Sequence, residues 1–148
     1  TYSGTASAAL EGTLQDIQSI AFSIDGREKI DFRIAAQFAH KLVVEVIEKG
    51  LPKGTFLNVN IPNKTLSGIK GVKITQQGRR IWEDSVIQKI DPRGKKYYWI
   101  DGSSRGWQKG DETDSHAVKE GYISITPLQL DMTNYGAMEE LNDWGINL

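Results

Sequence analysis

The chain has 148 residues, of which 39% are hydrophobic and 25% charged, and its formal net charge is −1. This composition is typical of a globular domain, and the near-zero charge provides no general basic field for a nucleic-acid polymer or an anionic membrane. No apolar run approaches the roughly 20 residues of a membrane span. The sequence has no cysteine, which excludes disulfides, thiolate nucleophiles and cysteine-ligated zinc. We therefore expect a cytoplasmic protein.

The first stretch, Ser3-Gly4-Thr5 followed by the small residues of positions 6–12, predicts the start of a helix. Ser3 suits the N-cap position, and Gly4 would let a ligand approach the backbone closely. A helix start offers unpaired N–H groups and a partial positive charge, to which Ser3 and Thr5 add hydroxyl donors. The stretch therefore predicts a phosphate or carboxylate site. The alternative is an ordinary capped helix that packs through its small side chains.

Two strands flank a long helix in the next segment. Residues 18–24 and 56–62 are short apolar runs, and Pro62 is expected to end the second strand. Between them an apolar stripe of helical period begins after Asp31, a natural N-cap, and ends at Gly50. Strand, helix and strand in this order predict a parallel pair in one sheet.

Asn58 and Asn60 alternate with apolar neighbours in the second strand and are expected to share one face. An asparagine there can hold a ligand, although pairing with a loop at the sheet edge is the more common role. A polar linker over residues 64–71 and a further strand over residues 72–76 are expected next.

A long β-hairpin is predicted from residues 79–90 and 95–100, joined by Asp91-Pro92-Arg93-Gly94. Aspartate, proline and glycine occupy the positions that a type I turn favours. Because an isolated two-stranded ribbon is marginal in water, its aromatic residues must cover the same domain or meet another subunit. For Trp82, Tyr97, Tyr98 and Trp99, spacing alone does not decide between packing on the same domain and contact with another subunit.

The Gly-rich stretch of residues 101–114 predicts a loop. Asp114 is a candidate cap for a helical turn through Lys119, and it can also be combined with Ser3 and His116 into a catalytic triad. No strand–turn–helix elbow supports Ser3 as a nucleophile. Asp111, Glu112, Asp114 and His116 could also form a metal site. The alternative, which is more common for carboxylates in a Gly-rich loop, is that these side chains are simply solvated.

Residues 121–128 alternate in the manner of a strand, which is expected to end at Pro127. Asn134 is then expected to open a last helix, with Met138, Leu141 and Trp144 along its apolar edge. Such a helix either docks on its own domain or exchanges with a partner.

Several of these segments together resemble the SurE (survival protein E) family of 5′/3′-nucleotidases. The resemblance follows the chain in order and is carried by Tyr2-Ser3-Gly4-Thr5 with Ala8 to Gly12, Leu57 to Pro62, Asp91 to Gly94 with Tyr97-Tyr98-Trp99, Thr113-Asp114, and Gly121 to Leu128. Each motif is weak alone, but their order and spacing extend over the whole chain.

The resemblance implies an α/β fold: an incomplete Rossmann-like three-layer α/β/α core with a protruding hairpin and a C-terminal helix. Residues 1–78 would form the carboxy-terminal part of the core. Residues 79–102 would form the hairpin, used for oligomerisation. Residues 103–148 would supply a loop, a strand and a C-terminal helix that is swapped between protomers.

The resemblance also implies a metal-dependent phosphohydrolase acting on nucleoside monophosphates, with Mg²⁺ or Mn²⁺ as its ion. Ser3, Gly4 and Thr5 match the phosphate side of the family's site. The hairpin residues, Asp91, Pro92, Arg93 and Gly94 with Tyr97, Tyr98 and Trp99, match its oligomer interface. The expected assembly is a homodimer or homotetramer.

One departure from the family pattern concerns the metal ligands. The family uses two adjacent aspartates, a serine and an asparagine, all from the amino-terminal part, and this sequence contains none of these motifs. The 148 residues therefore resemble the carboxy-terminal three-fifths of such an enzyme and are expected to be inactive alone. The alternatives are a non-catalytic module that builds oligomers and a phosphate-binding domain without turnover.

Overall fold

The structure is a computed structural model that describes residues 3–26, 29–107, 110 and 112–146. The helices and strands follow in the order α1 (Gly4–Leu14), β1 (Ile20–Asp25), α2 (Phe32–Lys49), β2 (Thr55–Pro62), a 3₁₀ turn (Leu66–Gly68), β3 (Gly71–Ile74), β4 (Arg80–Ile90), β5 (Lys96–Trp107), α3 (Asp114–Glu120), β6 (Tyr122–Gln129) and α4 (Tyr135–Asn142). In the described part of the chain, no helix combines the length and the hydropathy needed to cross a bilayer.

Four strands form the central sheet in the order β1-β2-β6-β3. β1 and β2, which flank α2, run parallel with Ile20 opposite Leu57, so the predicted parallel pair is confirmed. β6 lies antiparallel to β2 and parallel to β3. The sheet is therefore mixed rather than wholly parallel.

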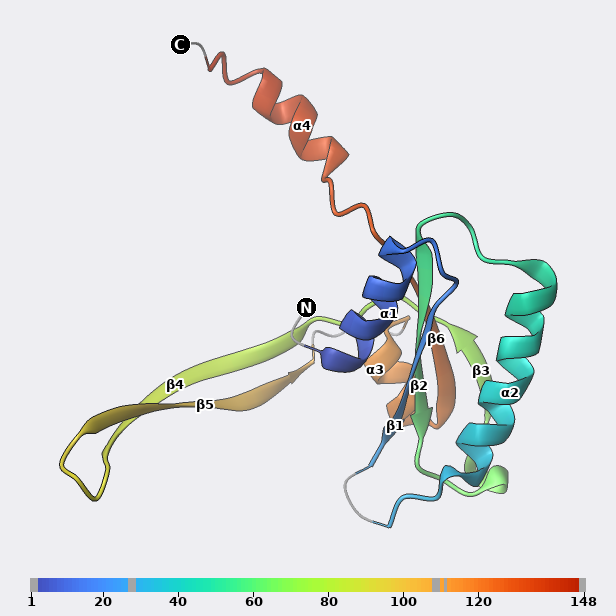
Figure 1. The fold of residues 1–148 in the computed structure, drawn as a ribbon, viewed down its shortest axis with the longest axis horizontal. Coiled ribbons are helices and arrows are strands. Elements are labelled where there is room, and N and C mark those ends of the chain that lie inside the picture. The colour runs from blue at the N-terminus through green and yellow to red at the C-terminus, as the bar shows by residue number, and fades with distance from the viewer. Residues whose placement is uncertain (1–2, 27–28, 108–109, 111, 147–148) are drawn as a thin grey trace.

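Helices cover both faces of this sheet (Figure 1), with α2 on one side and α1 and α3 on the other. Alternate residues of β2 explain the arrangement: Leu57, Val59 and Ile61 join the cluster that contains Val46 of α2. Phe56 joins the opposite cluster, which contains residues of α1. The predicted three-layer α/β/α fold, with its protruding hairpin and C-terminal helix, is confirmed.

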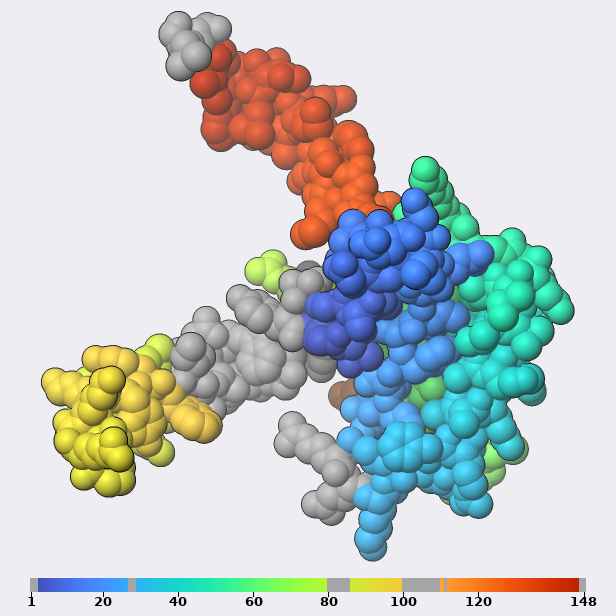
Figure 2. All heavy atoms as spheres, viewed as in Figure 1, coloured from blue at the N-terminus to red at the C-terminus, as the bar shows by residue number. Residues whose placement is uncertain are grey.

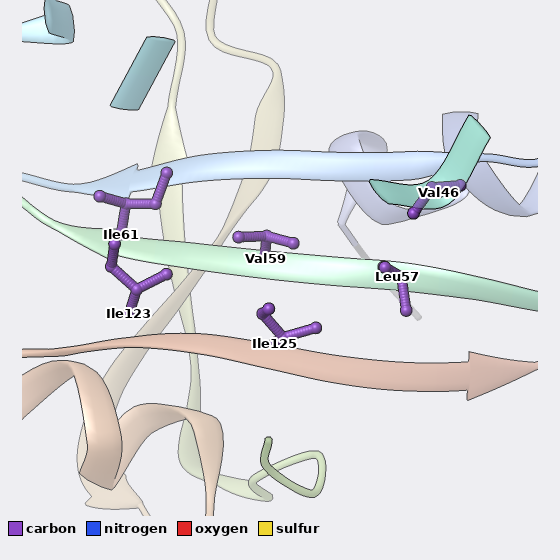
Figure 3. Packing of buried hydrophobic residues seen from close by; sticks show 6 residues of the cluster. All are labelled: Val46, Leu57, Val59, Ile61, Ile123 and Ile125. Carbon is purple, nitrogen blue, oxygen red and sulfur yellow. The ribbon is translucent and has the colours of Figure 1, made fainter. Parts of the chain in front are cut away.

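The larger core cluster lies between α2 and the sheet (Figure 3), where Val59 is 0% and Ile61 2% exposed. We expect Ile61→Ala to lower the free energy of unfolding of the full-length protein by about 2–5 kcal/mol, since the lost contacts leave a cavity in a close-packed site. Thermal unfolding measures the effect. Val72→Ala is the control, because Val72 on β3 is 49% exposed; equal losses at both positions would contradict the assignment of Ile61 to the core.

The helix ends follow the predicted capping residues. The Ser3 hydroxyl accepts the Ala6 N–H at 3.3 Å, the Asp31 carboxylate accepts the Arg33 N–H at 3.0 Å, and Asn134 caps α4. The expectation for α3 is wrong: Thr113, not Asp114, is the N-cap and accepts the His116 N–H. Asp114 is instead the first residue of α3, and its carboxylate accepts a hydrogen bond from the Gly78 N–H.

β4 and β5 form the predicted hairpin, which extends away from the body of the molecule (Figure 2). At its tip the Gly94 N–H donates to the Asp91 carbonyl at 2.9 Å, which is the hydrogen bond of the expected turn. The prediction of a loop over residues 101–114 is wrong for its first half, because β5 continues to Trp107. The hairpin therefore extends beyond its expected boundary at residue 102. The reason is nonlocal. β4 has 11 residues and pairs with β5 as far as Trp107, so this stretch of β5 is a strand although its own composition is that of a loop.

β6 does not end at Pro127 as expected but continues to Gln129. The Ile125 carbonyl accepts the Thr75 N–H, so the backbone groups of Ile125 point toward β3. With the two-residue period of a strand, the backbone of Pro127 points the same way, past Ile74 where β3 has ended. At this position no neighbouring strand is present to accept a backbone N–H. β6 therefore tolerates proline here, because the missing N–H costs no hydrogen bond.

Beyond β6 the chain turns at Asp131 and α4 extends away from the sheet (Figure 1). Hydrogen bonds from Thr133 and from the Tyr135 hydroxyl shape this turn and lower the pKa of Asp131 to about 2. Met138 and Leu141 on the helix are 50% and 45% exposed. Within the protomer α4 is therefore not docked by its expected apolar edge, and exchange with a partner stays a prediction.

Candidate functional site

A cavity of about 380 Å³ lies on the face of the sheet that α1 and α3 cover, and we name it the α1–α3 cavity. Asp25 and Asn60 stand at the carboxyl ends of the parallel strands β1 and β2, the edge at which α/β sheets commonly bind ligands. The cavity is lined by Ser3, Thr5, Ala6, Leu10, Ser23, Ile24, Asp25, Phe56, Asn58, Asn60, Gln77, Asp114, Ser115, Val118 and Leu128.

The start of α1 forms one wall of the cavity. Ser3 and Thr5 are both exposed and both line it. The Ser3 hydroxyl also caps the helix, whereas the Thr5 hydroxyl has no protein hydrogen bond within the described part of the chain. Gly4 is not a lining residue, and a Cβ placed on it would meet nothing within 4 Å. Two of the three predicted phosphate-site residues therefore face the cavity, and their role stays a prediction.

The ends of β1 and β2 supply the floor with polar side chains: Ser23, Asp25, Asn58 and Asn60. The two asparagines share one face, as expected, but that face opens on the cavity rather than on a loop at the sheet edge. Ser23 and Asp25 were not predicted. Their signal in the sequence was weak, namely a polar residue at every second position where an apolar strand ends.

The opposite end of the cavity is apolar. Leu10, further along α1 than Ser3 and Thr5, packs with Leu128 against the cluster that contains Phe56, which is 3% exposed. The cavity therefore has a polar end near the helix start and the strand ends, and an apolar end around Phe56. Pockets for small organic ligands usually combine a mainly apolar lining with a few placed polar groups.

Asp114 and Ser115 at the start of α3 line the cavity from another side. Asp114 is buried, and its carboxylate accepts the N–H groups of Gly78 at 3.0 Å and of Ser115 at 2.6 Å. Ser3 and Asp114 thus reach the same cavity, but His116 is not among the residues that line it. The structure does not assemble the triad considered from the sequence.

A metal centre is not assembled by the described residues alone. Asp111, one of the loop residues considered as a ligand, lies outside them. Within the described ranges, no group of three or more histidine, aspartate or glutamate side chains lies close enough to hold an ion. The described cavity lining contains two carboxylates, Asp25 and Asp114, and no lysine or arginine.

Residues 1–84 match the family model described as "Survival protein SurE". Among similar proteins, "5'-nucleotidase SurE" of Aquifex aeolicus is 48% identical over 95% of this chain and 56% of its own length. The Geobacter sulfurreducens protein of the same name is 47% identical over 99% of this chain and 56% of its own length. The crystal structure of the SurE protein from Aquifex aeolicus superposes with a TM-score of 0.78 at 46% identity, covering 98% of this chain and 58% of that one.

The chain thus spans a little over half the length of the relatives it matches. The family model covers more than half of the chain, from α1 through β3 to the first residues of β4. The chain belongs to the SurE survival protein family.

Proposed function

We propose that this chain is part of a metal-dependent nucleotidase that removes phosphate from 5′- and 3′-nucleoside monophosphates. The observation that carries the proposal is the start of α1, whose Ser3 and Thr5 face a cavity of about 380 Å³. A volume of this order suits a small organic ligand. The name "5'-nucleotidase SurE" borne by similar proteins supports the choice of reaction. A cytoplasmic location, with which a sequence without cysteine is compatible, is part of the same proposal.

In this proposal the polar end of the cavity holds the phosphate. The hydroxyls of Ser3 and Thr5 and the free N–H groups of the first turn of α1 donate to phosphate oxygens. Such donors contribute most where negative charge builds up in the transition state. The floor residues Asn58 and Asn60 add carboxamides that can donate to the ligand or accept from it.

We further propose that the divalent ion is Mg²⁺ or Mn²⁺, which prefer oxygen ligands. When bound, it would polarise the phosphate and balance the negative charge that Asp25 and Asp114 leave uncompensated. Because the described residues do not form its ligand set, its ligands are proposed to lie in sequence that the longer relatives have beyond the matched part. The 148-residue chain alone is accordingly proposed to be inactive.

Chelation tests the metal. EDTA added to the full-length protein is expected to abolish phosphate release from nucleoside monophosphates, and excess Mg²⁺ or Mn²⁺ is expected to restore it. The control is EDTA saturated with Mg²⁺ beforehand, which should leave turnover intact. Full activity after exhaustive chelation would contradict metal dependence.

The reaction itself is tested by following inorganic phosphate released from 5′- and 3′-nucleoside monophosphates by the full-length protein. We expect turnover of monophosphates and little of the matching triphosphates. Nucleotide binding without phosphate release would favour the phosphate-binding domain considered from the sequence. Assembly without binding would favour the non-catalytic oligomer module.

The proposed assembly is a homodimer or homotetramer. The hairpin presents Tyr98 and Trp99, which are 61% and 59% exposed, next to the turn at residues 91–94, and Trp144, two residues beyond the end of α4, is 64% exposed. Exposed aromatic side chains on two projecting elements are typical of surfaces that become buried against a partner. The partner in this proposal is a second copy of the chain.

A further inference from the structure

The segment between β3 and β4 is fixed against the start of α3 by hydrogen bonds on both sides of Gln77. The Gln76 N–H donates to the Glu112 carbonyl, and the Asp114 N–H donates to the Gln76 carbonyl, both at 3.0 Å. The Gly78 N–H donates to the Asp114 carboxylate, also at 3.0 Å. We name this set of contacts the hairpin root, because β4 and the rest of the hairpin begin directly after it (Figure 1).

The hairpin root is closely packed. A Cβ on Gly78 would lie 2.8 Å from the Asp114 carboxylate and 3.0 Å from the Ser115 hydroxyl, so any larger residue at this position would displace the Asp114 side chain. Asp114 is only 8% exposed, which means that its carboxylate is committed to this contact rather than to solvent. The backbone of Gln77 is therefore held by contacts of the residues on both sides, and Gln77 is itself exposed and is one of the residues that line the α1–α3 cavity.

We propose that Gln77 binds the nucleoside part of the substrate, and that Asp114 is the positioning residue that holds Gln77 at the cavity. This inference rests on the proposed nucleotidase function. It assigns a specificity role to a residue at the base of the hairpin, far in the sequence from the helix start that holds the phosphate.

The chemistry of the two residues supports the nucleoside rather than the phosphate. A carboxamide both donates and accepts, which matches a sugar hydroxyl or the edge of a nucleobase. The Asp114 carboxylate beside the root repels a phosphate dianion but tolerates neutral hydroxyl and amino groups. The phosphate is better placed at Ser3 and Thr5, where the start of α1 supplies hydrogen-bond donors.

The test compares Gln77→Ala with Gln76→Ala in the full-length enzyme. Gln76 carries the same side chain one residue earlier but does not line the cavity, and only its backbone takes part in the root. Each variant is assayed with a nucleoside monophosphate and with p-nitrophenyl phosphate, which lacks a nucleoside. We expect Gln77→Ala to raise KM for the nucleotide about tenfold with little change in kcat, and to leave p-nitrophenyl phosphate hydrolysis unchanged.

Variants of Asp114 test the positioning role. Asp114→Ala is expected to raise KM for the nucleotide as Gln77→Ala does and to speed amide hydrogen exchange at Gly78. Asp114→Asn keeps an acceptor oxygen and should restore most of both properties relative to Asp114→Ala. If Asp114→Ala does not fold, Gly78→Ala displaces the same contact from the other side. Adding Gln77→Ala to whichever variant folds should then have little further effect on KM.

The outcomes separate this inference from the function on which it rests. A Gln77→Ala enzyme that matches Gln76→Ala on the nucleotide would overturn the inference while leaving the nucleotidase intact. Equal losses on the nucleotide and on p-nitrophenyl phosphate would also overturn it, because Gln77 would then serve the phosphate. A wild-type enzyme that hydrolyses p-nitrophenyl phosphate but no nucleotide would refute the proposed function and this inference together.

Discussion

Thr5→Ala in the full-length enzyme is expected to lower kcat/KM for nucleoside monophosphates by about tenfold or more, and by up to about a thousandfold. The reason is geometric. Thr5 lines the cavity at the first turn of α1, and its hydroxyl makes no protein hydrogen bond within the described residues, so the hydroxyl is available to donate to a ligand. Most of the loss should fall on kcat if this donor acts mainly in the transition state.

Ser7→Ala is the matched control for Thr5→Ala. Ser7 also lies on α1, but its hydroxyl donates to the Ser3 carbonyl and does not line the cavity. Ser3→Ala is less clean as a test, because losing the N-cap also costs about 1 kcal/mol of stability. An unchanged kcat/KM in Thr5→Ala would remove the helix start from the site, and comparison of the unfolding temperatures of all three variants separates stability from activity.

Replacing Tyr98 and Trp99 together by serine is expected to dissociate the proposed oligomer and to raise its dissociation constant by about 30-fold or more. Each aromatic side chain can bury roughly 150–250 Å² in an interface. Because both are more than half exposed in the protomer, the core should lose little when they are removed. Sedimentation velocity over a range of concentrations measures the change in assembly.

Phe32→Ser serves as the control for the hairpin variant. Phe32, at the start of α2, is 66% exposed and lies on neither projecting element. If the hairpin variant and the control keep the same mass as the wild type, the aromatic residues do not form the interface. If both dissociate, the effect is a general loss of exposed aromatic surface rather than a hairpin contact.

The elements that the sequence predicted well are those determined by neighbouring residues. Ser3, Asp31 and Asn134 cap helices because a short polar side chain reaches an N–H group two or three residues ahead. The turn at Asp91 formed for the same kind of reason, since the Asp91 side chain also accepts the Arg93 and Lys95 N–H groups.

The errors arose where distant segments decide the structure. Residues 101–107 have the composition of a loop, yet each of them except Arg105, where the register shifts, pairs with a residue of β4. Asp114 was expected to cap its own helix, but Thr113 does so, and the Asp114 carboxylate reaches Gly78, 36 positions earlier in the sequence. Neither contact can be inferred from local spacing.

The same division applies to the site. The helix start at Ser3 and Thr5 was predicted as an anion site because its chemistry is local. Ser23, Asp25 and Gln77 were not predicted, because only the fold brings the ends of two strands and the hairpin root to one cavity. Sequence patterns can indicate which strand face is polar, but not which other segments will share that face.

Pro127 also affects whether the edge of the sheet can pair with a strand of another molecule. Past Ile74, the outer side of β6 has no neighbouring strand in the described sheet, and such a bare edge could recruit a strand from another chain. Proline presents no N–H there and places a ring where an incoming backbone would have to pair. The residue that β6 accommodates without losing a hydrogen bond is therefore also one that makes this edge a poor template for an incoming strand.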